Sequence, residues 1–203
     1  MDQDFITAFV ENFLSRLQAI KVSEESIEAF RNRHQIVHTK AKQTLIDPGD
    51  ICKYSYLIIS GGFVCRYIHE NSGAACTINF YLDDLHPIMA CVDSFFTQVP
   101  THCELKAIAD SVVIATSKDL VDELRAKDPY FARFYHDVVV TAMVEENEVK
   151  TKLIAYSSRE KYEFILQEMP TVIQKVPSKY IAEFCGISAE WLSKLKKQKS
   201  VGD

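Results

Sequence analysis

This sequence of 203 residues lacks the features that mark several classes of protein. No apolar run approaches the roughly 20 residues that a membrane-spanning helix needs. The opening Met1–Asp4 stretch is acidic, unlike a secretory signal peptide. The patterns G-x-S-x-G, G-x-G-x-x-G and the phosphate-binding P-loop are all absent. We therefore expect a cytoplasmic protein without membrane contact, cofactor or catalytic activity.

The spacing of the cysteines argues against a structural metal site. No C-x-x-C occurs, and no cysteine lies in a tight cluster with histidine, as zinc and iron–sulfur sites would need. We interpret the cysteines as reduced and mostly buried small apolar residues, with a redox-sensing cysteine as the alternative. They are Cys52, Cys65, Cys76, Cys91, Cys103 and Cys185.

A cupin-like metalloenzyme is a distant alternative, because a β-roll can hold a metal between clustered histidine and glutamate side chains. The six histidines are scattered and form no H-x-H. His34 and His38 have a helical ligand spacing but precede a predicted strand. The pair Asp83-Asp84 is more typical of a turn than of a catalytic dyad. The sequence thus predicts neither a metal site nor an enzyme.

Charge is distributed unevenly along the chain. The net charge of −5 argues against a general nucleic-acid-coating protein. Residues 1–150 carry 14 basic and 22 acidic side chains, whereas residues 151–203 carry nine basic and six acidic ones. An acidic body with a basic tail fits a small DNA-contacting segment, although an excess of three charges also arises by chance.

The last thirty residues show the pattern of two short helices joined by a tight turn. Ala182 supplies a small side chain where the helices would cross, and Gly186 suits a left-handed helix end. Ser188 is then a candidate N-cap, and Glu190 suits the positive end of the second helix. Apolar contacts are expected from Ile181, Ile187, Leu192 and Leu195. The pattern favours a helix-turn-helix whose second helix lies in the DNA major groove.

Six residues around the second helix are left to face a ligand. They are Ser188, Ala189, Glu190, Ser193, Lys194 and Lys197. The alternative is an ordinary helical hairpin with a solvated, lysine-rich end. A small residue four positions before a glycine, as in Ala182 and Gly186, is weak evidence by itself. The DNA-binding interpretation therefore depends on the helix caps and the apolar positions together.

Residues 34–117 change to a β-type pattern, in which short apolar runs alternate with turns. The turns include Asp47–Asp50, Ser60–Gly62 and Asn71–Gly73. Strands are predicted over residues 45–46, 54–59, 63–68, 76–81, 103–107 and 112–115. Such closely spaced strands predict an antiparallel barrel or roll. Helices are predicted on either side of it, over residues 2–18, 23–33 and 118–126.

A long helix is predicted from about Pro129 to Tyr156. One stripe at three-to-four spacing consists of Phe131, Phe134, Tyr135, Val138, Ala142, Glu145, Val149 and Leu153. This stripe could form a dimer seam or pack against the chain's own roll, and the sequence favours neither. A further helix is predicted over residues 158–168, capped by Ser157–Glu160 and ended by Pro170.

These elements together resemble the Crp/Fnr family of bacterial transcription regulators, the relatives of catabolite activator protein. Turns 47–50 and 60–62 match the first two turns of the family's roll. Segments 159–162, 176–183 and 186–195 are especially similar to the compact members of the Bacteroidetes. The resemblance implies an α+β fold with an N-terminal antiparallel, cyclic-nucleotide-binding-like β-roll, a long connecting dimer helix and a C-terminal helix-turn-helix domain.

The resemblance does not extend to the cyclic AMP site. Members that bind cyclic AMP carry a Gly-Glu pair and, about ten residues later, an arginine followed by a small hydroxyl residue, because a buried phosphate needs a charged partner. The corresponding segment 90–103 has neither the pair nor an arginine, and Thr101 and His102 take the place of the second motif. We expect no response to cyclic AMP, and we assign no cofactor-binding residue.

The resemblance also implies contacts with DNA. Glu190 could accept from a cytosine amino group, and Lys194 could donate to guanine. Backbone contacts are expected from Lys179 and Tyr180 at the start of the first helix. Phosphate contacts are expected from Ser193, Lys196, Lys197 and Lys199.

The expected organisation is a β-roll effector domain over residues 1–128, a dimerisation helix over 129–156 and a DNA-binding domain over 157–203. The expected partners are double-stranded DNA and a second copy of the chain, with an unknown small-molecule effector and RNA polymerase as further candidates. The alternative function is a cyclic-nucleotide or other small-ligand sensor that acts through protein contacts without binding DNA.

Overall fold

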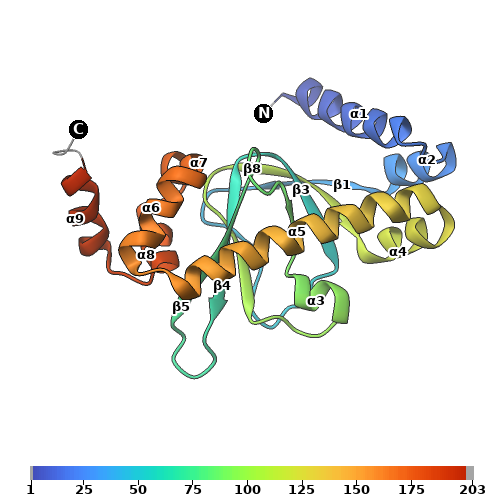
Figure 1. Ribbon diagram of the computed structural model, residues 1–203. Coiled ribbons are helices and arrows are strands. Elements are labelled where there is room, and N and C mark those ends of the chain that lie inside the picture. Colours follow the sequence, from blue (N-terminus) through green and yellow to red (C-terminus); the bar gives the residue numbers. More distant parts are fainter. Residues whose placement is uncertain (1, 200–203) are drawn as a thin grey trace.

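The structure is a computed structural model that describes residues 2–199, with two antiparallel sheets flanked by helices (Figure 1). The first half contains α1 (Gln3–Ala19), α2 (Glu24–Arg33), β1 (Gln35–Thr39), β2 (Thr44–Ile46), β3 (Tyr54–Ser60), β4 (Gly62–Ile68), β5 (Ala75–Leu82), β6 (Ile88–Met89) and α3 (Val92–Thr97). The second half contains β7 (Cys103–Ala107), β8 (Ser111–Ser117), α4 (Lys118–Lys127), α5 (Pro129–Ala155), α6 (Ser158–Glu168), α7 (Pro170–Lys175), α8 (Ser178–Cys185) and α9 (Ala189–Lys199).

The two sheets form the predicted β-roll. One sheet has the strand order β1-β8-β3-β6 and the other has the order β2-β7-β4-β5, with every pair antiparallel. A buried cluster between them includes Ile58, Phe63, Leu105 and Val113. Successive strand residues point to opposite faces, so one face of each strand supplies this core.

The turn between β3 and β4 requires glycine. Gly61 has a φ of +88°, and a Cβ at this position would lie 2.2 Å from the Ser111 Oγ atom. The Ser111 hydroxyl instead accepts a hydrogen bond from the Gly62 amide at 3.0 Å. The turn predicted at residues 60–62 is therefore closed by a serine from β8, nearly fifty residues later.

The helices before and after the roll are joined through Asp128. Its carboxylate accepts hydrogen bonds from the amides of Tyr130 and Phe131 in the first turn of α5, and from the Ser23 amide at 2.8 Å. Ser23 in turn caps α2, as predicted, by accepting from the Ser26 amide. Asp128 thus holds the starts of two helices that are more than a hundred residues apart.

Several local predictions need correction. Helix α6 ends at Glu168, as predicted, but Pro170 then begins a separate helix, α7, that was not predicted, because proline is well tolerated in a first helical turn. The pattern missed strand β1, which contains His38, whereas His34 lies at the C-cap of α2. The pattern also missed the short helix α3, whose Cys91 N-cap makes no side-chain capping bond.

Helix α5 runs along the roll and leads from α4 to α6 (Figure 1). The stripe predicted from the sequence faces the chain's own roll and helices: Phe131, Phe134, Tyr135, Val149 and Leu153 all pack against buried clusters. Glu145 on the same stripe pairs with His86, 3.0 Å from its Nδ1 atom. Most of this stripe therefore packs within the chain, whereas Ala142 and Glu145 remain exposed.

Candidate nucleic-acid interface

Helices α8 and α9 are joined by the tight turn that the sequence predicts. Gly186 has a left-handed φ of 68° at the end of α8. The amides of Gly186 and Ile187 donate to the carbonyl oxygens of Glu183 and Ala182, at 3.1 and 3.0 Å. These bonds satisfy the last turn of α8, and a side chain at Gly186 would strain the backbone.

The start of α9 is capped by a serine. The Ser188 Oγ atom accepts a hydrogen bond from the Trp191 amide at 3.2 Å. A hydrogen bond from Ser188 lowers the pKa of the Glu190 carboxyl from its usual value. A negative charge in the first turn also matches the positive end of the helix.

The predicted outer face of the second helix is exposed. Leu192 and Leu195 point inward and are buried, which leaves the other side of α9 to solvent. The exposed residues there are Ser188, Ala189, Glu190, Trp191, Ser193, Lys194 and Lys197, and Lys179 on α8 is exposed as well. In Figure 1, α9 lies at the end of the molecule opposite to α1 and α2. A DNA duplex can therefore approach this face without displacing the roll.

One predicted contact residue lies elsewhere. Tyr180 is only 2% exposed and belongs to the buried cluster beneath α8, with its ring 5.4 Å from the Arg66 guanidinium carbon. Its neighbour Lys179 remains at the surface, with its ammonium group 4.4 Å above the same ring. The expectation that the Tyr180 side chain contacts the DNA backbone is therefore wrong for this arrangement, because the ring fills the core between α8 and the roll.

Two of the predicted phosphate contacts, Lys196 and Lys199, lie near the end of α9. The Lys196 Nζ atom donates to the Ser178 hydroxyl at 2.7 Å, which links α9 to the start of α8. The Lys199 side chain lies outside the described part of the structure.

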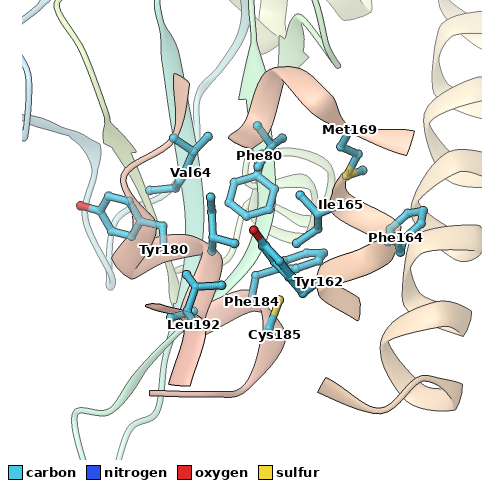
Figure 2. Packing of buried hydrophobic residues seen from close by; sticks show 14 of the residues in the cluster. Val64, Phe80, Tyr162, Phe164, Ile165, Met169, Tyr180, Phe184, Cys185 and Leu192 are labelled. Atoms are coloured by element: carbon cyan, nitrogen blue, oxygen red, sulfur yellow. The ribbon is translucent and has the colours of Figure 1, made fainter. Parts of the chain in front are cut away.

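The helix-turn-helix is packed against the roll through a large apolar cluster (Figure 2). Val64 and Phe80 come from strands β4 and β5, whereas Tyr162, Ile165 and Phe184 come from α6 and α8. The rings of Phe80 and Phe184 are in contact, tilted by 45° to each other, with their centroids 4.9 Å apart. Burial of these side chains places α8 directly on β5 and fixes the position of α9 relative to the roll.

A polar group beside this cluster was not predicted from the sequence. Glu183 on α8 receives two hydrogen bonds from Arg66 on β4 and a third from the Thr77 hydroxyl on β5, at 2.8 Å. Arg66 also pairs with Glu104 on β7. No local pattern reveals these contacts, because the partners are separated by up to 117 positions.

The segment that replaces the cyclic AMP motif contains α3. His102 is half exposed and its Nδ1 atom lies 3.1 Å from Glu70, so it points out of the roll. Thr101 is 1% exposed. Among the residues that the structure describes, no arginine, lysine or histidine is buried. This interior thus lacks the cation that a buried phosphate needs.

The face of α5 opposite the roll is apolar and uncovered. Val140, Met143, Val144 and Ile154 are exposed, Met143 and Val144 by about 60% and Ile154 by 80%. At about 3.6 residues per turn these positions share one side of the helix with Asn147 and Thr151. This second stripe was not predicted from the sequence.

Within the part of the chain that the structure describes, no helix is both long and apolar enough to cross a membrane. In the same part, no group of three or more histidine, cysteine, aspartate or glutamate side chains is arranged to hold a metal ion.

No protein-family model and no curated protein matches the sequence, but solved structures match the fold. FixK2 from Bradyrhizobium japonicum superposes with a TM-score of 0.71 at 13% identity, over 83% of this chain and 85% of that one. CLP from Xanthomonas campestris, a c-di-GMP-responsive global regulator, gives 0.68 at 14% identity, over 89% and 93%.

A third match is a putative transcriptional regulator of the Crp/Fnr family from Eubacterium rectale. It gives a TM-score of 0.67 at 14% identity, over 89% of this chain and 84% of that one. Two of these three proteins are described as regulators. The resemblance inferred from the sequence is thus confirmed at the level of architecture: the chain has the fold of Crp/Fnr transcription regulators, with a β-roll, a long helix and a C-terminal helix-turn-helix.

Proposed function

We propose that this protein is a transcription regulator of the Crp/Fnr type that binds double-stranded DNA through α9. The observation that carries the proposal is the exposed outer face of α9, which presents Glu190, Ser193 and Lys194 on a helix held by the Gly186 turn. A helix of this kind fits the major groove, where carboxylate and ammonium groups distinguish base pairs. Glu190 and Lys194 would contact bases, whereas Lys179, Ser193 and Lys197 would contact phosphates.

The active form in this proposal is a homodimer formed through α5. Val140, Met143, Val144 and Ile154 follow the spacing of a two-helix seam, and pairing with a second copy would remove them from water. Asn147 lies on the same stripe, where a polar residue can specify one register. Two α9 helices related by a two-fold axis would then contact half-sites roughly 34 Å apart.

The proposed functions of the domains follow their order along the chain. Residues 1–128 form the effector domain, 129–156 the dimerisation helix and 157–203 the DNA-binding domain. Any effector would act by binding two poses of the DNA-binding domains with different affinity. Cyclic AMP is not that effector in our proposal, because no buried cation among the described residues faces the roll interior and His102 points toward Glu70.

A DNA-binding measurement with Trp191, the sole tryptophan of the chain, tests the proposal. Its fluorescence would be followed while mixed-sequence duplex DNA is added at low and at moderate salt, with and without cyclic AMP. We expect a salt-sensitive change that cyclic AMP does not alter, and matching anisotropy of a labelled duplex. If cyclic AMP strengthens DNA binding, the proposal that cyclic AMP is not the effector is wrong, but the proposal that the protein binds DNA stands.

A selection from a random duplex library separates the remaining outcomes. The proposal predicts enrichment of a two-fold symmetric site with half-sites about one helical turn apart. If neither fluorescence nor anisotropy responds at any salt and no site is enriched, the protein does not bind DNA. The alternative of a sensor that acts through protein contacts would then be preferred.

A further inference from the structure

Glu183 on α8 contacts both the roll and the turn that leads to α9. Its side-chain oxygens accept hydrogen bonds from Arg66 on β4 and from the Thr77 hydroxyl on β5. Its backbone carbonyl oxygen accepts from the Gly186 amide at 3.1 Å, which is one of the bonds that end α8. The Cys76 sulfur on β5 lies 4.0 Å from the same carbonyl oxygen. One residue therefore connects two strands of the roll with the turn of the helix-turn-helix.

The three bonds to the Glu183 carboxylate fix its orientation. Oε2 accepts from the Arg66 Nε atom at 2.9 Å and from the Thr77 hydroxyl at 2.8 Å, and Oε1 accepts from the Arg66 Nη2 atom at 3.0 Å. Two parallel bonds from a guanidinium group determine the plane of a carboxylate as well as its distance. Because the third bond comes from a different strand, the carboxylate is also prevented from turning about the axis of the Arg66 pair.

Arg66 is itself held in place from the side of the roll. Glu104 on β7 pairs with the Nη1 atom, and Lys106 lies 3.5 Å from the other oxygen of Glu104. The Tyr180 ring lies 5.4 Å from the guanidinium carbon, and the Arg66 side chain is 16% exposed. Its two bonds toward Glu183 therefore start from a group whose position is set by strands β4 and β7.

The apolar cluster beneath α8 attaches this helix to the roll without specifying its position as sharply. Phe80 of β5 and Phe184 of α8 meet in this cluster. Apolar burial is non-directional, so a small shift of the helix changes the buried area little. Hydrogen bonds, in contrast, require a narrow range of distances and angles. The polar contacts of Glu183 are thus the part of this interface that is most sensitive to the position of α8.

The covalent connection does not fix α9 either. A single extended residue, Tyr156, lies between the end of α5 and the N-cap Ser157 of α6. Contacts at this corner come from Lys152 and Tyr156, which lie beside the Phe164 ring. Helix α9 lies farther out, beyond α6 and α8 (Figure 1). A small rotation at the corner would therefore move α9 by a larger distance.

We propose that Glu183, held by Arg66 and Thr77, is a positioning residue that sets the separation of the two α9 helices in the dimer. This inference rests on the proposed function, because it concerns how a dimer contacts two half-sites. Each α9 is tied to its own roll through the Glu183 carboxylate and the Gly186 turn, and the α5 seam ties the two rolls to each other. Such a dimer accepts one half-site spacing, although Glu183 itself does not contact DNA.

A rigid and a flexible pair of DNA-binding domains respond differently to half-site spacing. When two binding modules are joined rigidly, the second one binds only where the geometry allows both contacts at once. A flexible connection tolerates many spacings, at a lower effective concentration for each. Loosening Glu183 should therefore reduce the preference for one spacing and leave the affinity of one α9 for a single half-site unchanged.

Anisotropy measurements on three labelled duplexes test the proposal. The first carries the selected two-fold site, the second has roughly five additional base pairs, half a turn, between the half-sites, and the third has one half-site. We expect the natural chain to bind the first at least about tenfold more tightly than the second. Glu183→Gln should reduce this ratio to about threefold or less, with single half-site affinity within about twofold. The glutamine keeps the shape of the side chain, but its NH₂ group cannot accept a hydrogen bond.

Two further variants support the comparison. Thr77→Val removes the third bond to Glu183 at a buried position and should lower the ratio in the same direction, by less. It also tests the proposal if Glu183→Gln fails to fold. Lys175→Ala is the matched control, because Lys175 on α7 pairs with Asp83 and Asp84 of the roll at the rim, with 40% of its side chain exposed. It should leave the ratio unchanged, and circular dichroism should show that each variant is folded.

Several results would overturn the proposal. An unchanged ratio in Glu183→Gln and Thr77→Val would remove the positioning role, and an equal decrease in Lys175→Ala would assign the effect to the interface as a whole. Tighter binding of the selected site by Glu183→Gln would show that the docked position of α8 inhibits DNA binding. A natural chain that binds DNA without any spacing preference overturns this inference alone, whereas a natural chain that binds none of the duplexes overturns the proposed function as well.

Discussion

Arg66 on strand β4 and Glu183 on helix α8 form a two-pronged ion pair, with Nε–Oε2 at 2.9 Å and Nη2–Oε1 at 3.0 Å. The pair joins the roll to the first helix of the helix-turn-helix. Both side chains are partly buried, with 16% and 25% of their surface exposed, and Glu104 lies on the other side of the guanidinium. The arginine therefore separates two carboxylates that would otherwise face each other in a poorly solvated place.

Substitution Arg66→Ala should weaken the attachment of α8 to the roll. It leaves Glu104 and Glu183 without their shared partner, so we expect a loss of about 1–3 kcal/mol in the free energy of unfolding, below the value for a fully buried pair. Urea denaturation followed by circular dichroism measures this. Arg31→Ala is the matched control, because its ion pairs with Glu11 and Glu28 lie at the exposed surface and should contribute little to stability. Equal losses in the two variants would contradict the role assigned to Arg66.

Substitution Met143→Glu should convert the proposed dimer into a monomer. A carboxylate at this exposed position would lie in the apolar seam, where an unpaired charge is unfavourable. Sedimentation or light scattering should show the change in mass, and circular dichroism should show an unchanged fold. Thr141→Glu adds the same charge at an exposed position beside the stripe and should leave the dimer intact. A natural chain that is monomeric at all concentrations would refute the seam.

Substitution Lys194→Ala should weaken DNA binding without affecting stability, because the side chain is exposed on α9. If Lys194 contacts a guanine, we expect a loss of about 1–3 kcal/mol at the selected site and relaxed specificity at one position. If it contacts phosphate, the loss should be uniform and the salt slope should fall by about 1. Lys53→Ala, at an exposed lysine of the roll, is the control. No change for Lys194→Ala would remove this residue from the interface.

The Asp128 carboxylate should make stability depend on pH in the acid range. Burial tends to raise its pKa, but the hydrogen bonds from the Ser23 and Phe131 amides outweigh this and lower the pKa to about 2. The charged form therefore stabilises the fold above the unfolded pKa of about 4, by about 2 kcal/mol, and this contribution is lost as the pH falls toward 2. Acid denaturation curves measure the loss.

Asp128→Asn keeps a helix cap but removes the charge. Its stability should be lower at neutral pH, and the difference from the natural chain should shrink between pH 4 and 2. Asp137→Asn, at an exposed position of α5, should behave like the natural chain throughout. If the stability difference between Asp128→Asn and the natural chain does not depend on pH, the charge of the carboxylate does not contribute, and only its hydrogen-bond geometry does.

Local features were predictable from the sequence because they depend on residues a few positions apart. Ser23, Ser157 and Ser188 all cap the helices for which they were predicted, and Ser157 forms a complete capping box with Glu160. The left-handed turn at Gly186 follows from the absence of a side chain. The β-roll followed from the alternation of short apolar runs with turns.

Other features had no local signal. The apolar residues of α5 lie on two opposite faces, and only the position of the roll shows which face is covered. Tyr180 is buried rather than facing DNA because its ring packs between α8 and the roll, beside Arg66 of β4.

The sequence by itself therefore determined the order of the elements, the helix-turn-helix and the type of roll, since backbone preferences and hydrophobic periodicity act over short distances. Tertiary structure alone decided which surfaces remain free and which distant groups meet, such as Arg66 with Glu183 and Ser23 with Asp128. The reason is physical: these contacts depend on how two sheets and a bundle of helices bury their apolar faces together, and no spacing along the chain records that arrangement.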